Sequence, residues 1–310
     1  MFTRLVKHLS TGDELTFQYS AAGYGPNENG VPAEKIEGDI TAILDYRFTA
    51  TSKLSWYFDH HVSGFATDDD RLYYREQIEP FMGLGSHERR QMFHDGAYTS
   101  CTKLIADIGK DEFGLEVAPM GELVHWADMI DSAAFPTAEM AVERREPVLQ
   151  LMTVVEQFGN TAFLKDMVPL LSERPLIEVA TSKEVAEKFL PIHAAHQTFV
   201  DLVKQKAEKI GNCVYVDMSA ESLDVAPKFV TYALYPESAY SVVLTATPQK
   251  CKISVGYNPW SKTPRKHNIA AICERSGGGG HPVVGAISLR ANEVERARTL
   301  ARSIAVELDR

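Results

Sequence analysis

The sequence lacks the features of several large classes of protein. Its four cysteines are scattered through 310 residues without C-x-x-C spacing, which excludes a disulfide framework and a zinc ribbon. No run approaches the roughly 20 apolar residues of a membrane span, and the amino terminus lacks the pattern of a secretory signal. The formal net charge of −10 argues against a stable complex with duplex nucleic acid. We therefore expect a reduced, cytoplasmic protein.

Enough apolar material is present for more than one core. With 45% hydrophobic residues, a chain of 310 residues is expected to form two moderate cores. Helix-like segments predominate up to about residue 211, and short strand-like runs then follow. These runs cover residues 213–216, 229–233, 240–245 and 252–257, and an amphipathic helix is expected over 293–308.

Two apolar runs in the first part of the chain end at carboxylates. The run Ile40–Leu44 stops at Asp45, and Trp56–Phe58 stops at Asp59, which is followed by the pair His60 and His61. In an open α/β sheet, ligands bind beyond the carboxyl ends of the strands. The alternative interpretation is that each aspartate forms a turn and that the histidines form a hydrogen-bonded rim.

A second motif lies near the carboxyl end. Gly277–Gly280 is followed by His281 and by the strand-like run Ile287–Leu289. Glycine lets the backbone approach an anion closely, and successive N–H groups in such a turn form a nest for phosphate. The alternative is an ordinary flexible loop.

Together, Asp59-His60-His61 and the Gly277–His281 motif resemble the DHH phosphoesterases that carry an appended DHHA1 domain. The resemblance implies an α/β fold: a DHH domain with a mainly parallel sheet flanked by helices over 1–170, a helical connector over 171–211, and a smaller DHHA1 substrate-binding domain with a mixed sheet over 212–310. It implies hydrolysis of short oligonucleotides, cyclic or linear dinucleotides or 3′-phosphonucleotides. It also implies a divalent metal, Mn²⁺ before Mg²⁺ or Co²⁺, and a homodimer formed through the DHH domain.

The resemblance assigns roles to the residues at the strand ends. Asp45 matches the aspartate that bridges two metals, and His60 matches a metal-binding imidazole. His61 matches the residue that approaches the scissile phosphate, and Asp59 is expected to orient an imidazole. The remaining metal ligand is expected at Asp131, with Asp128 as the alternative. Hydroxide held between two metals would then attack the phosphorus.

In the second domain, the resemblance implies a site for the phosphate end of the substrate. The glycines Gly277, Gly278, Gly279 and Gly280, together with His281, match the family's substrate-binding element. Many relatives carry a serine or arginine contact where this chain has residues 256–262. The expected replacements are Asn258 and Lys262, with Arg265 as a further candidate.

One part of the family pattern is not found. The family opens with a strand that carries a His/Asp-x-Asp metal motif, whereas this sequence starts with a helix-like segment, Phe2–Leu9, that has no N-cap residue. We interpret Met1 as a displaced or artificial start, with a natural variant as the alternative. The polypeptide as given is then expected to be catalytically impaired. A second hypothesis is therefore a regulatory protein that binds nucleotide or phosphate without hydrolysing it.

Overall fold

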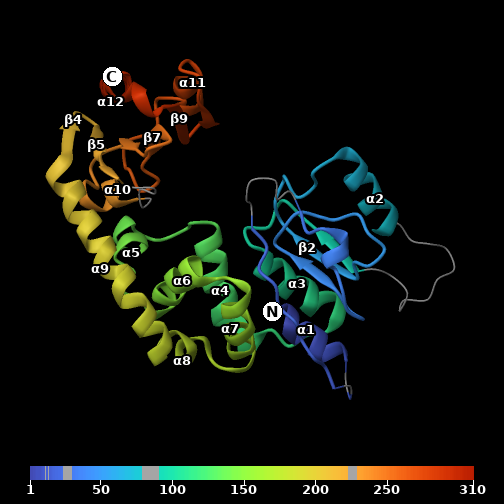
Figure 1. The fold of residues 1–310 in the computed structure, drawn as a ribbon. Helices are drawn as coiled ribbons and strands as arrows, with labels where there is room; N and C mark the ends of the chain where they lie inside the picture. The colour runs from blue at the N-terminus through green and yellow to red at the C-terminus, as the bar shows by residue number, and fades with distance from the viewer. Residues whose placement is uncertain (11, 13, 24–29, 79–90, 223–228) are drawn as a thin grey trace. The chain divides into compact units, whose positions relative to one another are not determined.

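The computed structural model describes residues 1–310 except 11, 13, 24–29, 79–90 and 223–228. The chain forms two compact units (Figure 1). Unit 1 comprises Met1–Ala134 and Val154–Ser182, and unit 2 comprises Phe135–Thr153 and Lys183–Arg310. The boundary between them falls within helix α6 (Pro147–Phe158). In the described segments, every helix is too short or too polar to span a lipid bilayer.

The elements of unit 1 follow one another as in an α/β protein. They are α1 (Phe2–Leu9), η1 (Ala33–Lys35), β1 (Ala42–Leu44), β2 (Trp56–Asp59), α2 (Asp68–Ile78), β3 (Gln91–His94), α3 (Cys101–Phe113), η2 (Ala118–Met120), α4 (Gly121–Asp131), α7 (Thr161–Glu173) and α8 (Leu176–Ala180). Over the described residues, the sheet has the order β1-β2-β3, and both pairs of strands are parallel. The carboxyl ends of these strands therefore lie at the same edge.

Strand β2 is buried on both faces, as expected for the central strand of a parallel sheet. Trp56 and Phe58 pack with Leu5 of α1 and Leu104 of α3. Tyr57, which points to the opposite face, packs with Tyr74 and other apolar residues on that side. This two-sided packing holds the end of β2, and hence the Asp-His-His sequence, in a fixed position.

Unit 2 is built around a mixed sheet. Its elements are α5 (Ala138–Glu143), α9 (Lys183–Lys206), β4 (Ala207–Ile210), β5 (Cys213–Ser222), α10 (Val230–Leu234), β6 (Tyr240–Ala246), β7 (Lys250–Tyr257), α11 (Ile269–Glu274), β8 (Gly279–His281), β9 (Val284–Arg290), η3 (Ala291–Glu293) and α12 (Val294–Leu308). The strand order is β4-β5-β6-β7-β9-β8 over the described residues. Only the β5–β6 pair among these is parallel.

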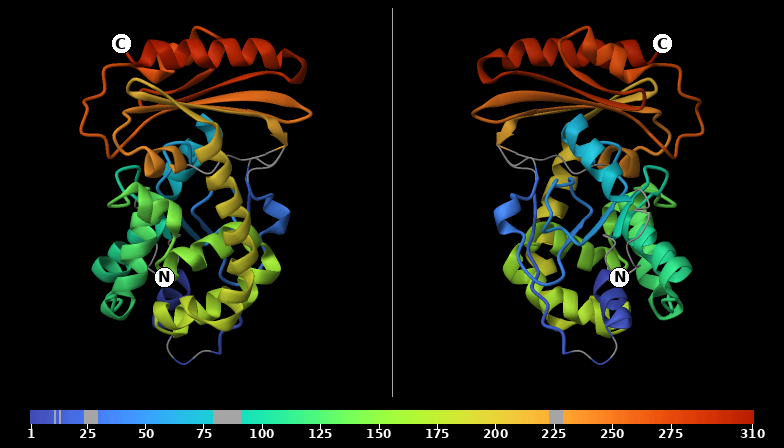
Figure 2. Two further views of the ribbon diagram at one scale, coloured as in Figure 1. Left: turned by 90° about the vertical axis from the view of Figure 1, so that its left-hand side faces the viewer. Right: turned by 90° about the vertical axis from the view of Figure 1, so that its right-hand side faces the viewer.

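Helices cover both faces of the unit 2 sheet. Helix α12 lies along one face (Figure 2), where its Ala301 and Ile304 pack against Val242 and Ile253. On the other face, residues of α9 and α10 pack against β5, as in the cluster that contains Val203, Val214 and Val230. The α/β class expected from the sequence, with a parallel sheet followed by a mixed sheet, is confirmed.

Three local expectations differ from the structure. Residues 230–234 form helix α10, not a strand; the sequence Val-Thr-Tyr-Ala-Leu is β-prone, but its apolar side packs across α9 and β5. The end of the expected helical connector forms strand β4, which pairs with β5. The glycine motif is also not a simple turn, because Gly279–His281 forms strand β8 at the edge of the sheet.

Helix α3 begins beside the end of β2, and its N-cap gives a test of how that helix is held. Ser100, which is 1% exposed, accepts a hydrogen bond from the backbone N–H of Lys103 at 3.2 Å. Ser100→Ala leaves this N–H without its partner, so we expect the free energy of unfolding to fall by about 1 kcal/mol. Urea denaturation measures the change. Ser100→Thr keeps a hydroxyl that can accept the same hydrogen bond and is the control, expected to cost only a few tenths of a kcal/mol; equal losses in both variants would contradict the capping role.

Candidate metal centre

Asp45 reaches the edge of the sheet through an unusual backbone conformation. It directly follows β1 and has a φ of 57°, in the left-handed region, which aspartate adopts more readily than most residues. Its N–H donates to the carbonyl of Phe58 at 2.8 Å, which ties it to the neighbouring strand. The turn thereby places the carboxylate beside the residues that follow β2.

One ring nitrogen of His60 makes no hydrogen bond and faces two carboxylates. Its Nδ1 lies 3.1 Å from the carbonyl of Tyr98, so Nδ1 carries the proton and donates it there. Its Nε2 is buried and makes no hydrogen bond, although it lies 3.2 Å from Asp45 Oδ1 and 3.2 Å from Asp131 Oδ2. These separations are within ion-pair range, but the geometry is not that of hydrogen bonds. An imidazole nitrogen flanked by two carboxylates is a donor set that suits a divalent cation, and the carbonyl behind the ring is the usual orienting partner.

The structure separates the two aspartates of helix α4 that the sequence left as alternatives. Asp131, at the end of the helix, lies against His60. Asp128 points to the start of α3, where it accepts a hydrogen bond from Thr99 at 2.5 Å and lies 3.5 Å from Lys103 Nζ. Burial alone would raise the pKa of Asp128, but the hydrogen bonds from Thr99 and Ser100 and the charge of Lys103 outweigh this effect, so the pKa is lowered.

His61 is held by the buried carboxylate of Asp59. Asp59 Oδ1 lies 2.8 Å from His61 Nδ1 and 3.3 Å from the His61 backbone N–H. Burial by itself lowers the pKa of His61, but the hydrogen bond to Asp59 and the charges of Asp59, Asp45 and Asp131 together raise it above its ordinary value. The ring therefore favours the protonated form more than a free histidine does.

These residues form a compact, negatively charged cluster. Within the described residues, Asp45, His60 and His61 each offer a ligand atom, and the three atoms lie within 4.8 Å of one another. Burial raises the pKa of Asp45, and the charge of Asp131 raises it further, although the two histidines act in the opposite direction. A cation would relieve this repulsion. We call Asp45, His60, His61 and Asp131 the acidic–histidine cluster.

The substrate-binding residues expected in unit 2 do not share one environment. Lys262 is exposed, and Arg265 donates to the carbonyls of Pro282 at 2.8 Å and His267 at 3.2 Å. Arg265 thus lies next to the exposed His281. Asn258 is 1% exposed; its amide donates to Ser238 O at 2.9 Å and accepts from the Trp260 N–H at 3.0 Å, so it stabilises its own loop.

Much of the glycine motif is explained by packing. A Cβ on Gly278 would lie 2.2 Å from the carbonyl oxygen of Ala286, and Gly280 combines a φ of 153° with an equally close approach to Val284 O. The N–H groups of Gly277 and Gly278 donate to Glu274 O and Cys273 O at the end of α11. Two of the N–H groups expected to face an anion are thus already bonded.

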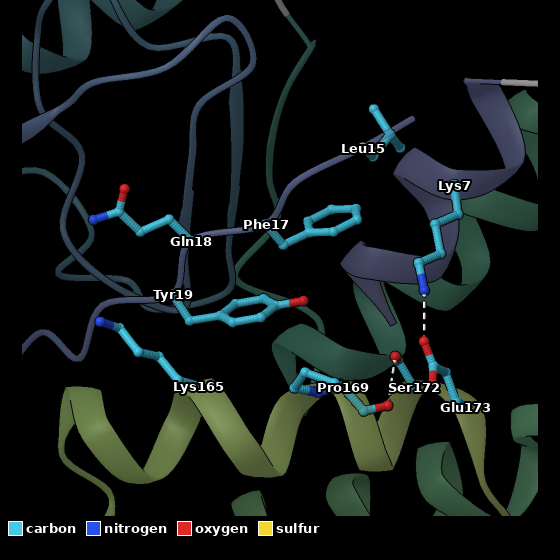
Figure 3. Close-up of a pocket in the computed structure, with 9 residues that line it drawn as sticks. All are labelled: Lys7, Leu15, Phe17, Gln18, Tyr19, Lys165, Pro169, Ser172 and Glu173. Carbon is cyan, nitrogen blue, oxygen red and sulfur yellow. Dashed lines mark hydrogen bonds and ion pairs between the residues drawn. The ribbon is translucent and has the colours of Figure 1, made fainter. Parts of the chain in front are cut away.

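A cavity of about 520 Å³ lies elsewhere in unit 1 (Figure 3). It is bordered by α1, by residues 15–19 and by α7. The rings of Phe17 and Tyr19 lie parallel there, and the charge of Lys7 is paired with Glu173 at 2.8 Å. The described residues of its lining include no histidine or aspartate, so they offer neither the ligands nor the acid–base groups of the acidic–histidine cluster.

Two residues that support the cluster, Tyr57 and His94, were not predicted from the sequence. The Tyr57 hydroxyl donates to Asp59 Oδ2 at 3.1 Å, and His94 Nε2 lies 2.8 Å from the carbonyl of His61. The alternation of side chains along a strand indicates the contact between Tyr57 and Asp59, because residues 57 and 59 share a face of β2. The contact of His94 could not be predicted without the strand register, in which Asp59 is paired with His94.

Comparison with solved structures shows which fold this is. The chain superposes on the pGpG-specific phosphodiesterase PggH from Vibrio cholerae with a TM-score of 0.64 and 17% identity, covering 97% of this chain and 93% of the other. The chain shares its fold with this phosphodiesterase. An exopolyphosphatase-related protein from Bacteroides fragilis also matches, with a TM-score of 0.42 and 14% identity over 89% of this chain and 74% of the other. No protein-family profile and no curated protein sequence matches the chain.

Proposed function

We propose that this protein is a metal-dependent phosphoesterase of the DHH type that hydrolyses short oligonucleotides, cyclic or linear dinucleotides, or 3′-phosphonucleotides. The proposal rests on the environment of His60 Nε2, which is buried, makes no hydrogen bond and lies 3.2 Å from each of two carboxylates. The fold shared with a protein named as a pGpG-specific phosphodiesterase supports the choice of a nucleotide substrate.

In this proposal, Asp45, His60 and Asp131 hold the cation, for which Mn²⁺ is the first candidate. When bound, a divalent cation supplies positive charge that activates water and neutralises phosphate oxygens. The carbonyl of Tyr98 keeps His60 protonated on Nδ1 and thus keeps Nε2 free as a ligand. In its protonated form, His61 keeps its Nδ1–H on Asp59 and donates its Nε2–H proton to a phosphate oxygen.

For unit 2, we propose that the exposed His281, Lys262 and Arg265 attract the terminal phosphate of the substrate, with the backbone of Gly279 and Gly280 close by. This proposal is supported by the exposure of the three cationic or titratable side chains and by the contact of Arg265 with Pro282. Asn258 is expected to act indirectly by keeping its loop in place.

The proposal predicts metal-dependent hydrolysis. With Mn²⁺ present, we expect the 310-residue chain to bind the ion in isothermal titration calorimetry and to convert the linear dinucleotide pGpG to mononucleotides in a chromatographic assay, with slow turnover because one of the family's metal motifs is not found in the sequence. Treatment with EDTA is expected to abolish hydrolysis, and added Mn²⁺ to restore it. Hydrolysis that persists in EDTA would refute the metal mechanism. Binding of pGpG without turnover at any metal concentration would favour a regulatory nucleotide-binding protein instead.

A further inference from the structure

The two oxygens of the Asp59 carboxylate have different partners. Oδ1 accepts from His61, through the ring Nδ1–H at 2.8 Å and the backbone N–H at 3.3 Å. Oδ2 accepts from the hydroxyl of Tyr57 at 3.1 Å. Both Asp59 and Tyr57 are 0% exposed, so water does not compete for either oxygen. The Tyr57 hydroxyl is thus an internal partner for the side of Asp59 that faces away from His61.

The proton of the Tyr57 hydroxyl has two acceptors within reach. Asp59 Oδ2 lies at 3.1 Å and the neutral carbonyl of Gly64 at 3.4 Å. Burial, followed by the negative charge of Asp59, raises the pKa of Tyr57 far above its ordinary value, so the hydroxyl stays protonated. A single hydroxyl proton goes to the nearer and charged acceptor, because hydrogen bonds to charged groups are the stronger ones.

We propose that Tyr57 is a positioning residue: by bonding Asp59 Oδ2, it fixes the rotation of the carboxylate, so that Oδ1 faces His61 Nδ1 and His61 presents Nε2 to the substrate. This inference rests on the proposed function, which gives His61 its role at the phosphate. Tyr57 itself lies beneath the sheet edge, buried against Tyr74 and Phe48, and does not reach the acidic–histidine cluster.

Asp59 determines the orientation of the His61 ring more than it determines the position of the His61 backbone. The backbone carbonyl of His61 is held separately, by His94 Nε2 at 2.8 Å. Without the Tyr57 hydroxyl, Asp59 Oδ2 would be a buried acceptor with no partner, and the carboxylate would gain by rotating towards another donor. This rotation removes the preference of His61 for a proton on Nδ1. Loss of the hydroxyl therefore alters the tautomer and leaves the course of the chain in place.

The test is Tyr57→Phe in the 310-residue chain without metal, read by NMR with ¹⁵N-labelled histidine at alkaline pH, where the His61 ring is neutral. In the wild-type protein, we expect His61 to be in the Nδ1–H form. In Tyr57→Phe, we expect a mixture of the two neutral tautomers. Where pGpG hydrolysis is measurable, kcat is expected to fall about tenfold with KM unchanged, because the substrate contacts remain.

Tyr74→Phe is the matched control. Tyr74 is 9% exposed and belongs to the same aromatic cluster, but its hydroxyl lies 3.4 Å from the Met92 carbonyl and does not contact Asp59. Its His61 signals and kcat are expected to match those of the wild type. An unchanged His61 tautomer in Tyr57→Phe overturns the inference, as does an equal change in Tyr74→Phe.

Two further outcomes are separable. The NMR measurement needs neither metal nor substrate. If the protein shows no hydrolysis, the proposed function is refuted, but the His61 tautomer still tests the role of Tyr57. If Tyr57→Phe does not fold, the wild-type protein gives the decision: the Tyr57 hydroxyl proton is expected as a slowly exchanging downfield signal that shifts the Asp59 carboxyl ¹³C resonance on deuteration. Absence of that isotope shift would overturn the inference.

Discussion

His60→Gln is expected to weaken the binding of Mn²⁺ by more than about a hundredfold, since changes that only disturb the orientation of a ligand already cost about 10–100-fold. His60 Nε2 is the one atom within 3.2 Å of both Asp45 and Asp131 among the described contacts, so its loss leaves two repelling carboxylates without the nitrogen between them. Glutamine keeps a polar side chain of similar length. Isothermal titration calorimetry measures the affinity, and pGpG hydrolysis is expected to be lost with it.

His125→Gln is the control for this variant. His125 is exposed on α4, the helix that ends at Asp131, and it takes no part in the acidic–histidine cluster. Its replacement is expected to leave Mn²⁺ affinity unchanged. If His60→Gln binds Mn²⁺ as tightly as the wild type does, the cation is held elsewhere and the assignment of the metal centre is wrong.

Gly64→Ala is expected to lower the free energy of unfolding by about 3 kcal/mol, the upper end of the range for an overpacked core. A Cβ at this position would lie 2.2 Å from Asp59 Oδ2, 3.0 Å from the carbonyl of His61 and 3.1 Å from the Tyr57 hydroxyl. None of these atoms is the free end of a flexible side chain, because Asp59 and Tyr57 are buried and bonded to each other. Urea denaturation monitored by circular dichroism measures the loss.

Gly96→Ala provides the comparison in the same neighbourhood. A Cβ there would meet only Val62 Cγ2 at 3.5 Å and the carbonyl of His60 at 3.9 Å, both ordinary contacts. We expect its stability to remain within about 0.5 kcal/mol of the wild type. Equal stabilities for Gly64→Ala and the wild type would show that Asp59 can move aside, contrary to the rigid arrangement described above.

The residues at the strand ends could be predicted because the signal for them lies in a few consecutive residues of the sequence. A short apolar run that stops at a carboxylate is visible in the sequence, and parallel pairing then brings Asp45 to the end of β2. The choice between Asp131 and Asp128 could not be made in the same way. It depends on where α4 lies against α3, since Thr99 and Lys103 bind Asp128 and leave Asp131 to face His60.

The remaining differences come from contacts between residues far apart in sequence. The glycine motif indicated a turn because glycine permits positive φ, yet residues 279–281 pair with β9 and form an edge strand. The segment 230–234 has β-branched and aromatic residues, but packing between α9 and β5 makes it helical. Tyr57 was recognised only as part of an apolar strand, because strand alternation shows that Tyr57 shares a face with Asp59 but does not show whether its hydroxyl bonds the carboxylate.

The burial of every cysteine has a practical consequence for following the cluster in solution. Cys101, Cys213, Cys251 and Cys273 are all buried free thiols, and burial raises the pKa of each, which keeps them unreactive towards maleimides in the native state. Val62 directly follows His61 and is 81% exposed. A cysteine introduced at this position would therefore take a spin label or fluorophore selectively, one residue away from the proposed catalytic histidine, without any of the natural thiols having to be removed.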